Sequence, residues 1–213
     1  MIDRPRSYHH GDLRRALVEE GLRLARDRGM AALGLREVTR SVGVTANAAY
    51  RHFPDRHGLV LAVAIEAQQK LARHLADRMQ ADSVGVPADE LALRHLRAFC
   101  LGYIEFALEE RGWFELACYT QHAPADAVPT LAEGQPVAPP YLLLIDALDE
   151  LVAAGALSHA QRVDAEWVCW SGVQGFTELA IDGPLDGQDR AVLDRLATRV
   201  VDVLIRGLAP LSQ

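Results

Sequence analysis

Residues 35–59, LREVTRSVGVTANAAYRHFPDRHGL, contain two short helical patterns separated by a glycine. Apolar and small residues on both sides of Gly43 predict helices over about 35–42 and 45–52. Gly43 supplies the left-handed backbone conformation that a β-carbon would penalise, and Thr45 is a suitable N-cap for the second helix. A helix, a glycine turn and a second helix at this spacing predict a helix-turn-helix.

The second of these helices is too short to build much core, yet it is rich in polar side chains. It carries, close together, the polar side chains Asn47, Tyr50, Arg51 and His52. Side chains of this kind need a binding partner outside the protein. A short exposed helix fits the major groove of DNA, where its side chains reach base edges, and its N-terminus suits a phosphate. The stretch therefore predicts a DNA-binding surface.

Helical periodicity extends on both sides of this stretch. Apolar residues between Leu13 and Ala25 recur at steps of three and four, which predicts a first helix that ends before Gly29. Downstream, Pro54 ends the helix-turn-helix, because its ring disfavours a continuing helix. Asp55 is then expected to cap a long helix that runs to about residue 81.

The rest of the chain is also predicted to be helical. Gly112 is expected to break one helix, and residues 123–140, which hold five prolines, are expected to form a loop. No strand alternation or internal repeat occurs. We therefore expect an all-α fold of about nine helices, with a three-helix helix-turn-helix head (1–57) on a larger helical body (58–213). The helices expected in this body run over about 87–111, 113–122, 141–154, 158–181 and 188–208.

Charge is divided unevenly along the chain. The 213 residues carry a net charge of -7, yet residues 1–57 hold 11 arginines against 7 acidic residues, whereas residues 58–213 hold 11 basic and 22 acidic residues. A basic head on an acidic body suits a protein that contacts phosphate at one end only. The acidic net charge therefore does not exclude DNA binding.

Composition argues against several other classes of protein. Half of the residues are apolar, enough for a real core, but no run of 18 apolar residues predicts a membrane span. The N-terminus lacks the apolar core of a signal peptide. Cys100, Cys118 and Cys169 are odd in number and widely spaced, so we expect buried thiols in a reducing cytoplasm. No nucleophile elbow, phosphate-binding loop or zinc-protease motif occurs, so no enzyme is expected.

Residues 8–66 resemble the N-terminal domain of TetR/AcrR-type repressors. The resemblance rests on the opening YHHGDLRR, on RDRG at 26–29, and on the LREV, GVT and AYRHFPDR segments of the helix-turn-helix. It implies base contacts by Ala46, Asn47, Ala48 and Arg51, with Asn47 suited to adenine and Arg51 to guanine. It implies phosphate contacts by Thr45, Tyr50, His52 and Arg56, although packing alone is an alternative for Tyr50. Arg4 and Arg6 fit either a minor-groove arm or a disordered tail.

A second resemblance concerns the body. The segment WSGVQG at 170–175 resembles the Trp-x3-His-Gly motif of a WHG-type C-terminal domain, with Gln174 in place of the histidine. The amide of Gln174 retains both a donor and an acceptor. The resemblance implies a small-molecule pocket, whereas for each aromatic residue taken alone a place in the helical core is the favoured interpretation. The expected pocket residues are Phe99, Tyr103, Phe106, Trp113, Phe114, Tyr119, His122, Trp167, Trp170 and Gln174.

The last helix carries an apolar stripe of Leu193, Leu196, Val200 and Val203. By resemblance to the family, this stripe and a neighbouring helix with small residues imply a four-helix homodimer interface, with internal packing as the alternative. Two recognition helices held about 34 Å apart would read a palindrome.

Together these patterns predict a repressor that binds a palindromic double-stranded DNA operator as a dimer. An unidentified small-molecule effector is expected to release it, with the long helix from Arg56 as the lever. The protein is expected in the cytoplasm, with no cofactor, metal or membrane partner. A TetR-like activator and a ligand-independent DNA-binding protein remain as alternatives.

Overall fold

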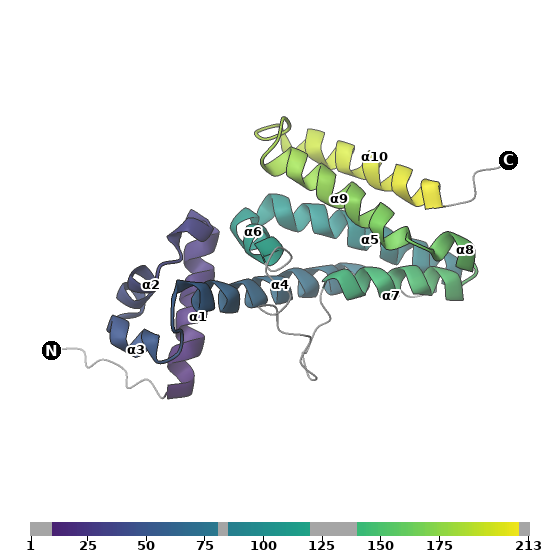
Figure 1. The fold of residues 1–213 in the computed structure, drawn as a ribbon. Helices are drawn as coiled ribbons and strands as arrows, with labels where there is room; N and C mark the ends of the chain where they lie inside the picture. The colour runs from purple at the N-terminus through teal and green to yellow at the C-terminus, as the bar shows by residue number, and fades with distance from the viewer. Residues whose placement is uncertain (1–9, 81–84, 120–139, 209–213) are drawn as a thin grey trace. The chain divides into compact units, whose positions relative to one another are not determined.

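The computed structural model describes residues 10–80, 85–119 and 140–208, and all regular elements within these ranges are helical (Figure 1). The all-α prediction is confirmed. Within the same ranges, no helix combines the length and the apolar character needed to cross a bilayer. The elements are α1 (His10–Arg28), the 3-10 helix η1 (Met30–Ala32), α2 (Leu35–Val42), α3 (Ala46–Tyr50), α4 (Arg56–Gln80), α5 (Ala88–Glu109), α6 (Arg111–Tyr119), α7 (Pro140–Ala153), α8 (His159–Arg162), α9 (Ala165–Ile181) and α10 (Arg190–Leu208).

The single helix expected over 158–181 is divided into α8 and α9. Ser158 opens α8 with a capping box in which its side chain and that of Gln161 each bond the other's backbone. Val163 then turns away from helical geometry, and Asp164 adopts a left-handed conformation at φ 60°. Aspartate tolerates this region better than most residues, which is why the break needs no glycine. The described chain therefore has ten α-helices where about nine were expected.

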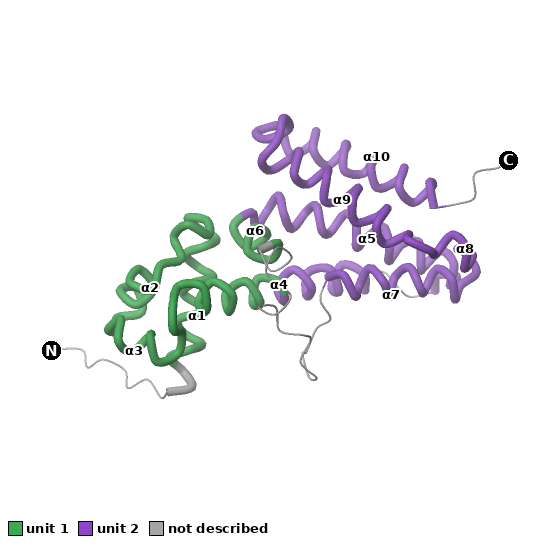
Figure 2. Tube along the Cα trace, in the orientation of Figure 1, with its two compact units in different colours: residues 1–68, 112–130 green, residues 69–111, 131–213 purple. Residues whose placement is uncertain are grey.

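The chain forms two compact units (Figure 2). Unit 1 comprises residues 1–68 and 112–130, and unit 2 comprises residues 69–111 and 131–213. Unit 1 thus takes in the first half of α4 and the later helix α6 in addition to the helix-turn-helix. The boundary expected at residue 57 separates a DNA-binding part from an effector-binding and dimerisation part. Because the compact units are defined by packing and not by function, this functional boundary stays a prediction.

Helix α6 joins unit 1 because it lies directly against α1. A β-carbon at Gly112 would come within 2.1 Å of the Ala25 carbonyl oxygen, so only glycine allows this approach. The Trp113 indole donates a hydrogen bond of 2.8 Å to the Leu22 carbonyl, and the Arg26 guanidinium lies 4.9 Å from the Trp113 ring. Gly112 was expected to break a helix, but it lies inside α6 and the break falls at Glu110.

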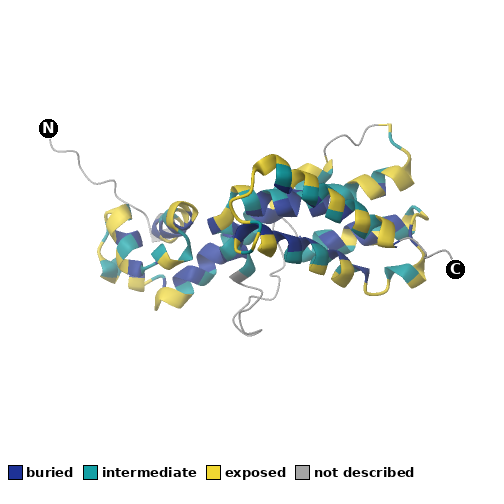
Figure 3. Cartoon of the chain, turned by 90° about the horizontal axis from the view of Figure 1, so that it is seen from above, coloured by how far each residue is buried: buried dark blue, intermediate teal, exposed yellow. Residues whose placement is uncertain are grey.

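Unit 2 is organised around α5. This helix packs against α7, α9 and α10, and its residues Leu96, Phe99 and Tyr103 have no exposed surface. In α10, for example, the buried residues Leu193, Ala197 and Val201 recur along one face, and Figure 3 colours the buried residues of both units dark blue. The approach of α9 to α10 depends on Gly172, where a β-carbon would meet the Leu204 side chain at 2.5 Å. Unit 2 is therefore a helical bundle with α5 at its centre.

Candidate DNA-binding surface and ligand site

The turn between α2 and α3 is set by Gly43. Its φ of 79° and ψ of 29° lie in the left-handed region, as the sequence predicted. The Gly43 N–H donates to the Arg40 carbonyl at 3.3 Å and the Val44 N–H donates to the Thr39 carbonyl at 3.0 Å. These two bonds form a Schellman motif, which pairs carbonyls that the end of α2 would otherwise leave free. The motif fixes the direction in which α3 begins.

Only a few residues fix helix α3 to the rest of unit 1. The Thr45 hydroxyl accepts a hydrogen bond of 3.4 Å from the Ala48 N–H, which confirms the predicted N-cap. Ala49 and the following Phe53 are buried and anchor the helix to unit 1. Because the Thr45 oxygen acts as the acceptor, its own O–H remains able to donate to a phosphate.

The opposite side of α3 faces solvent. Asn47 and Arg51 are exposed and Tyr50 is 50% exposed. Their side chains make no polar contact with the rest of the chain as far as the structure describes it. The other residues predicted near DNA on this segment, Ala46, Ala48 and His52, are half-buried. The structure therefore presents Asn47, Tyr50 and Arg51 together, at the centre of the predicted surface.

The start of α4 is fixed by two polar contacts. The Asp55 carboxylate accepts a hydrogen bond of 2.8 Å from the Gly58 N–H, so Asp55 caps α4 as predicted. The exposed Arg56 donates to the Met30 carbonyl at 3.2 Å. This contact ties α4 to η1 and uses one nitrogen of the guanidinium, so the remaining donors are available for a phosphate.

Most of the described arginines in the head (residues 1–57) form contacts with other residues of the chain. Glu37, for example, accepts hydrogen bonds from Arg28 at 2.9 Å and from Arg40 at 2.8 Å, and these guanidinium groups hold the pKa of its carboxyl below the usual range. Arg14 lies 5.3 Å from the Phe53 ring. Among the described residues of this head, the arginines without an intramolecular partner are Arg36 and Arg51. Counting charges along the sequence cannot distinguish Arg36 from the arginines that are paired within the chain.

The residues expected to line a ligand pocket are divided between the two units. Trp113 and Phe114 belong to unit 1, whereas the others that the structure describes belong to unit 2. The side chain of Tyr119 and all of His122 lie outside the described residues. The predicted set is therefore not one cluster within either unit. Those of its members that belong to unit 2 are Phe99, Tyr103, Phe106, Trp167, Trp170 and Gln174.

Within unit 2, the structure brings Tyr103, Trp170 and Gln174 together. The Tyr103 hydroxyl donates a hydrogen bond of 2.6 Å to the Gln174 side-chain carbonyl, and the Tyr103 and Trp170 rings meet edge to face with centroids 5.3 Å apart. The Gln174 amide nitrogen donates to the Glu178 carboxylate at 2.9 Å. Gln174 thus uses both of the hydrogen-bonding groups that the sequence offered at this position.

A third helix supplies a further aromatic residue to this cluster. Tyr141 of α7 has ring centroids 5.9 Å from Trp167 and 6.0 Å from Trp170. By contrast, Phe99 and Phe106 are buried core residues, and Phe106 packs against the His74 ring at 5.6 Å. We name Tyr103, Tyr141, Trp167, Trp170 and Gln174 the aromatic-amide cluster.

The apolar stripe on α10 is only partly exposed. Leu193 is 6% exposed and belongs to the core, Leu196 and Val200 are half-buried, and Val203 is 54% exposed. On the neighbouring α9, Val168 and Leu179 are exposed. Gly175 lies on that helix with open space where a side chain would stand. The large aliphatic side chains exposed on these two helices are therefore Val168 and Leu179 on α9 and Val203 on α10, whereas Leu193 is buried.

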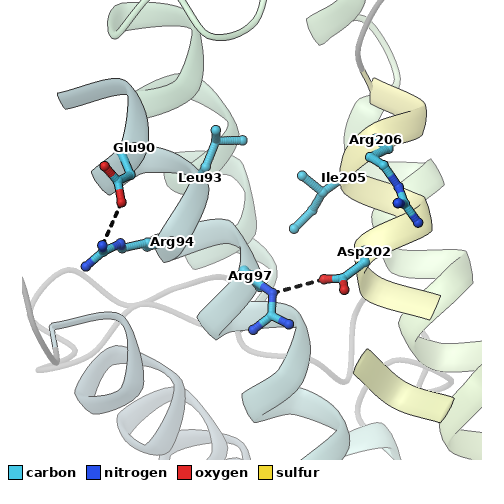
Figure 4. A pocket seen from close by; sticks show the side chains of 7 residues that line it. All are labelled: Glu90, Leu93, Arg94, Arg97, Asp202, Ile205 and Arg206. Carbon is cyan, nitrogen blue, oxygen red and sulfur yellow. Dashed lines mark hydrogen bonds and ion pairs between the residues drawn. The ribbon is translucent and has the colours of Figure 1, made fainter. Parts of the chain in front are cut away.

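A separate groove of about 330 Å³ lies between α5 and α10 (Figure 4). Arg94 pairs with Glu90 at 2.6 Å, and Arg97 pairs with Asp202 at 3.0 Å. Leu93 and Ile205 also line the groove. None of the expected pocket residues whose side chains the structure describes contributes to it.

Comparison with known proteins identifies the family. A family model described as the C-terminal domain of tetracyclin repressor-like proteins matches residues 96–204, and one described as bacterial regulatory proteins of the tetR family matches residues 17–63. No curated protein matches the sequence. A protein of unknown function from Rhodococcus sp. RHA1 has a TM-score of 0.74 and 27% identity, with 96% of this chain and 100% of that chain covered.

Two further solved structures share the fold. A TetR family transcription regulator from Marinobacter aquaeolei VT8 has a TM-score of 0.53 and 16% identity, over 90% of this chain and 94% of that one. A TetR variant from Acinetobacter baumannii AYE, in complex with minocycline, has a TM-score of 0.52 and 17% identity, over 94% of this chain and 96% of that one. With its N-terminal and C-terminal parts both matched, this chain belongs to the TetR family of bacterial regulatory proteins.

Proposed function

We propose that the protein is a ligand-responsive transcriptional repressor that binds a palindromic operator as a homodimer and is released by a small-molecule effector. The observation that carries the DNA-binding part is the solvent-facing side of α3, where Asn47, Tyr50 and Arg51 are exposed without intramolecular polar partners in the described chain. Such side chains on a helix of this kind are suited to the major groove.

The exposed residues of α3 have separable roles in this proposal. Asn47 pairs with an adenine edge and Arg51 with the O6 and N7 atoms of a guanine, whereas the half-buried Ala46 and Ala48 offer methyl contacts to thymine. Thr45, Tyr50, His52 and Arg56 contact phosphates, which position the helix without reading sequence. Arg36 is added as a phosphate contact, because it is exposed and unpaired within the described head.

The aromatic-amide cluster is the proposed effector site. It combines three kinds of group that a small-molecule site needs: aromatic faces, a phenol and an amide. The hydrogen bond between Tyr103 and Gln174 sets both polar groups in a fixed orientation. The similar Acinetobacter protein was solved with minocycline, which supports a small molecule as the effector class here.

The exposed face of α9 and α10 is the proposed dimer interface. Val168, Leu179 and Val203 expose apolar surface that a partner would cover, and the open space at Gly175 lets a facing helix approach. Leu193 contributes to the core beneath this face rather than to the interface. Dimerisation also follows the logic of DNA recognition, since one short helix reads few base pairs.

Two continuous stretches of chain connect the proposed effector site to the DNA-binding helices. Helix α4 begins beside the helix-turn-helix at Arg56 and continues into unit 2. Helix α5, which carries Tyr103, is followed after Glu110 by α6, which is bonded to α1 through Trp113. A ligand that favours one arrangement of α5 therefore changes the free energy of the arrangement that DNA selects, and DNA changes ligand affinity by the same factor.

The proposal is tested by fluorescence anisotropy. The full-length protein is titrated against a labelled DNA fragment from the intergenic region upstream of its own gene, and candidate small molecules are then added to the complex. Repression by ligand release predicts that one ligand class lowers the affinity for DNA. DNA binding that no ligand changes favours the ligand-independent alternative, whereas affinity raised by every active ligand contradicts release by an effector.

A further inference from the structure

Two cysteines that are distant in sequence meet inside unit 2. Cys100 of α5 and Cys169 of α9 are both free thiols without exposed surface. Their side chains are hydrogen-bonded to each other. No local pattern pairs them, because 69 positions separate the two residues and only the packing of α5 against α9 brings them together.

The pair lies next to the proposed effector site. Tyr103 follows Cys100 by about one turn of α5, and Trp170 and Gln174 follow Cys169 on α9, so the thiol contact and the Tyr103–Gln174 hydrogen bond belong to the same helix–helix contact. A covalent change at the cysteines therefore acts on the two helices that carry that site.

The two thiols are not chemically equivalent. The hydrogen bond from Cys100 lowers the pKa of the Cys169 thiol, and the positive charge of Arg162 acts in the same direction, against burial and Glu166. The pKa of Cys100 is raised, first by its bond to Cys169 and then by burial. Arg162 is held in place by Asp149 and Glu166, each at 2.6 Å. Since the thiolate is the nucleophilic form, Cys169 is the reactive member of the pair.

We propose that Cys100 and Cys169 form a redox modification site that reacts with hydrogen peroxide to give an α5–α9 disulfide. The Cys169 thiolate attacks one peroxide oxygen, the O–O bond breaks, and the departing hydroxide takes a proton to become water. The Cys100 sulfur then attacks the Cys169 sulfenic acid, and the displaced hydroxide leaves as water with the Cys100 proton. Two thiols are oxidised and one peroxide is reduced to two waters.

Neither thiol has exposed surface, and this limits the size of the oxidant that can reach the pair. A reagent must enter a packed contact between two helices, which favours one of about the size of water over bulky disulfides or organic hydroperoxides. The product has a consequence for the fold as well. A disulfide holds its sulfurs about 2.05 Å apart, closer than any hydrogen-bonded thiol pair, so oxidation draws α5 and α9 together at this point.

The chemical test follows the thiols directly. Reduced full-length protein is treated with increasing hydrogen peroxide, remaining thiols are alkylated in denaturant, and intact mass and unreduced peptides are measured. We expect a protein that carries one alkyl group instead of three and is lighter by two hydrogen atoms once the alkyl groups are subtracted. We also expect a joined pair of peptides containing Cys100 and Cys169, and reduction with dithiothreitol before alkylation removes both signs. A Cys118→Ala variant is the matched control and keeps this product. Oxidation of Cys118 alone, or disulfides only between molecules, would overturn the proposal.

Single variants test the order of the two steps. In Cys100→Ala, oxidation is expected to stop at a Cys169 sulfenic acid that dimedone traps, whereas in Cys169→Ala no sulfenic acid forms at Cys100 at comparable peroxide. Trapping at Cys100 in the second variant, as fast as at Cys169 in the first, would overturn the assignment of the nucleophile. Far-ultraviolet circular dichroism of each reduced variant verifies that it is folded.

The effect on DNA affinity rests on the proposed function and is read out separately. We expect the oxidised wild-type protein to differ from the reduced protein in affinity for its upstream DNA by about fivefold or more, and peroxide to leave the Cys100→Ala variant unchanged. A protein that forms the disulfide but never binds DNA contradicts the proposed function and leaves the redox site intact. A protein that binds DNA but forms no Cys100–Cys169 disulfide contradicts the redox site alone.

Discussion

Replacing Gly112 by alanine tests whether α6 is locked against α1. The new β-carbon would lie 2.1 Å from the Ala25 carbonyl oxygen, whereas real β-carbons essentially never come within 3.0 Å of such an atom. The helix must therefore retreat by about 1 Å, which stretches the 2.8 Å hydrogen bond from the Trp113 indole to the Leu22 carbonyl beyond the normal limit of about 3.2 Å.

The cost can be worked out from these contacts. Overpacking costs about 1–3 kcal/mol, the lost hydrogen bond about 1 kcal/mol, and the weakened contact between Arg26 and the Trp113 ring about 0.5 kcal/mol. The preference of helices for alanine over glycine offsets up to about 1 kcal/mol. We expect a net loss of about 1.5–4.5 kcal/mol, and a melting temperature lower by about 3–18 °C.

Urea and thermal unfolding followed by circular dichroism measure this loss. Gly58→Ala is the matched control in unit 1, because its β-carbon would meet Pro54 at an ordinary 3.4 Å. Since Gly58 lies in α4, this control should leave stability unchanged or raise it by up to about 1 kcal/mol. If Gly112→Ala is as stable as Gly58→Ala, the close approach of α6 to α1 does not exist in solution and the α5–α6 connection loses its basis.

Three further predictions concern recognition, acid stability and assembly. Asn47→Ala should relax preference at one base position by about 1–3 kcal/mol, whereas Tyr50→Phe should weaken operator and random DNA alike in competition anisotropy; equal losses on both DNAs for Asn47→Ala would remove its readout role. Because its folded-state pKa is depressed, Glu37 stabilises the fold above its unfolded pKa of about 4.3, and this contribution disappears as pH falls through the folded pKa. Urea unfolding should therefore show wild type more stable than Glu37→Gln at pH 7, with the difference shrinking toward pH 3; a constant difference would contradict the ion pairs. Gly175→Arg has open space for its side chain within the chain, so it should fold normally yet raise the dimer dissociation constant in sedimentation, and an unchanged constant would place the interface elsewhere.

Local chemistry made the helix-turn-helix predictable. The left-handed turn at Gly43 and the caps at Thr45 and Asp55 each depend on neighbours within a few residues, and the structure has all three. The same rules failed at Gly112, because that glycine serves a contact with a helix more than 80 residues earlier. They also missed the division at Asp164, since a left-handed aspartate leaves no mark in hydrophobic periodicity.

The candidate sites show a similar limit. Periodicity found an apolar stripe on α10, but it did not give the rotation that buries Leu193 and exposes Val203. Gln174 is bonded to Tyr103 and Trp113 is bonded to α1, and the part of either residue in a ligand site stays a prediction. Aromatic composition cannot distinguish these cases, because packing partners are set by tertiary contacts that no local pattern encodes.

The central claim is that α3 reads the base sequence of DNA, and its most direct test compares two DNA fragments. The affinity of the full-length protein is measured by anisotropy for its upstream fragment and for a scrambled fragment of the same composition, at one stated salt concentration. We expect wild type to prefer the upstream fragment by about a thousandfold or more, and Asn47→Ala combined with Arg51→Ala to lose most of that preference while retaining weak binding to both. Equal wild-type affinity for the two fragments, or a preference that survives the double substitution, would contradict sequence reading by α3.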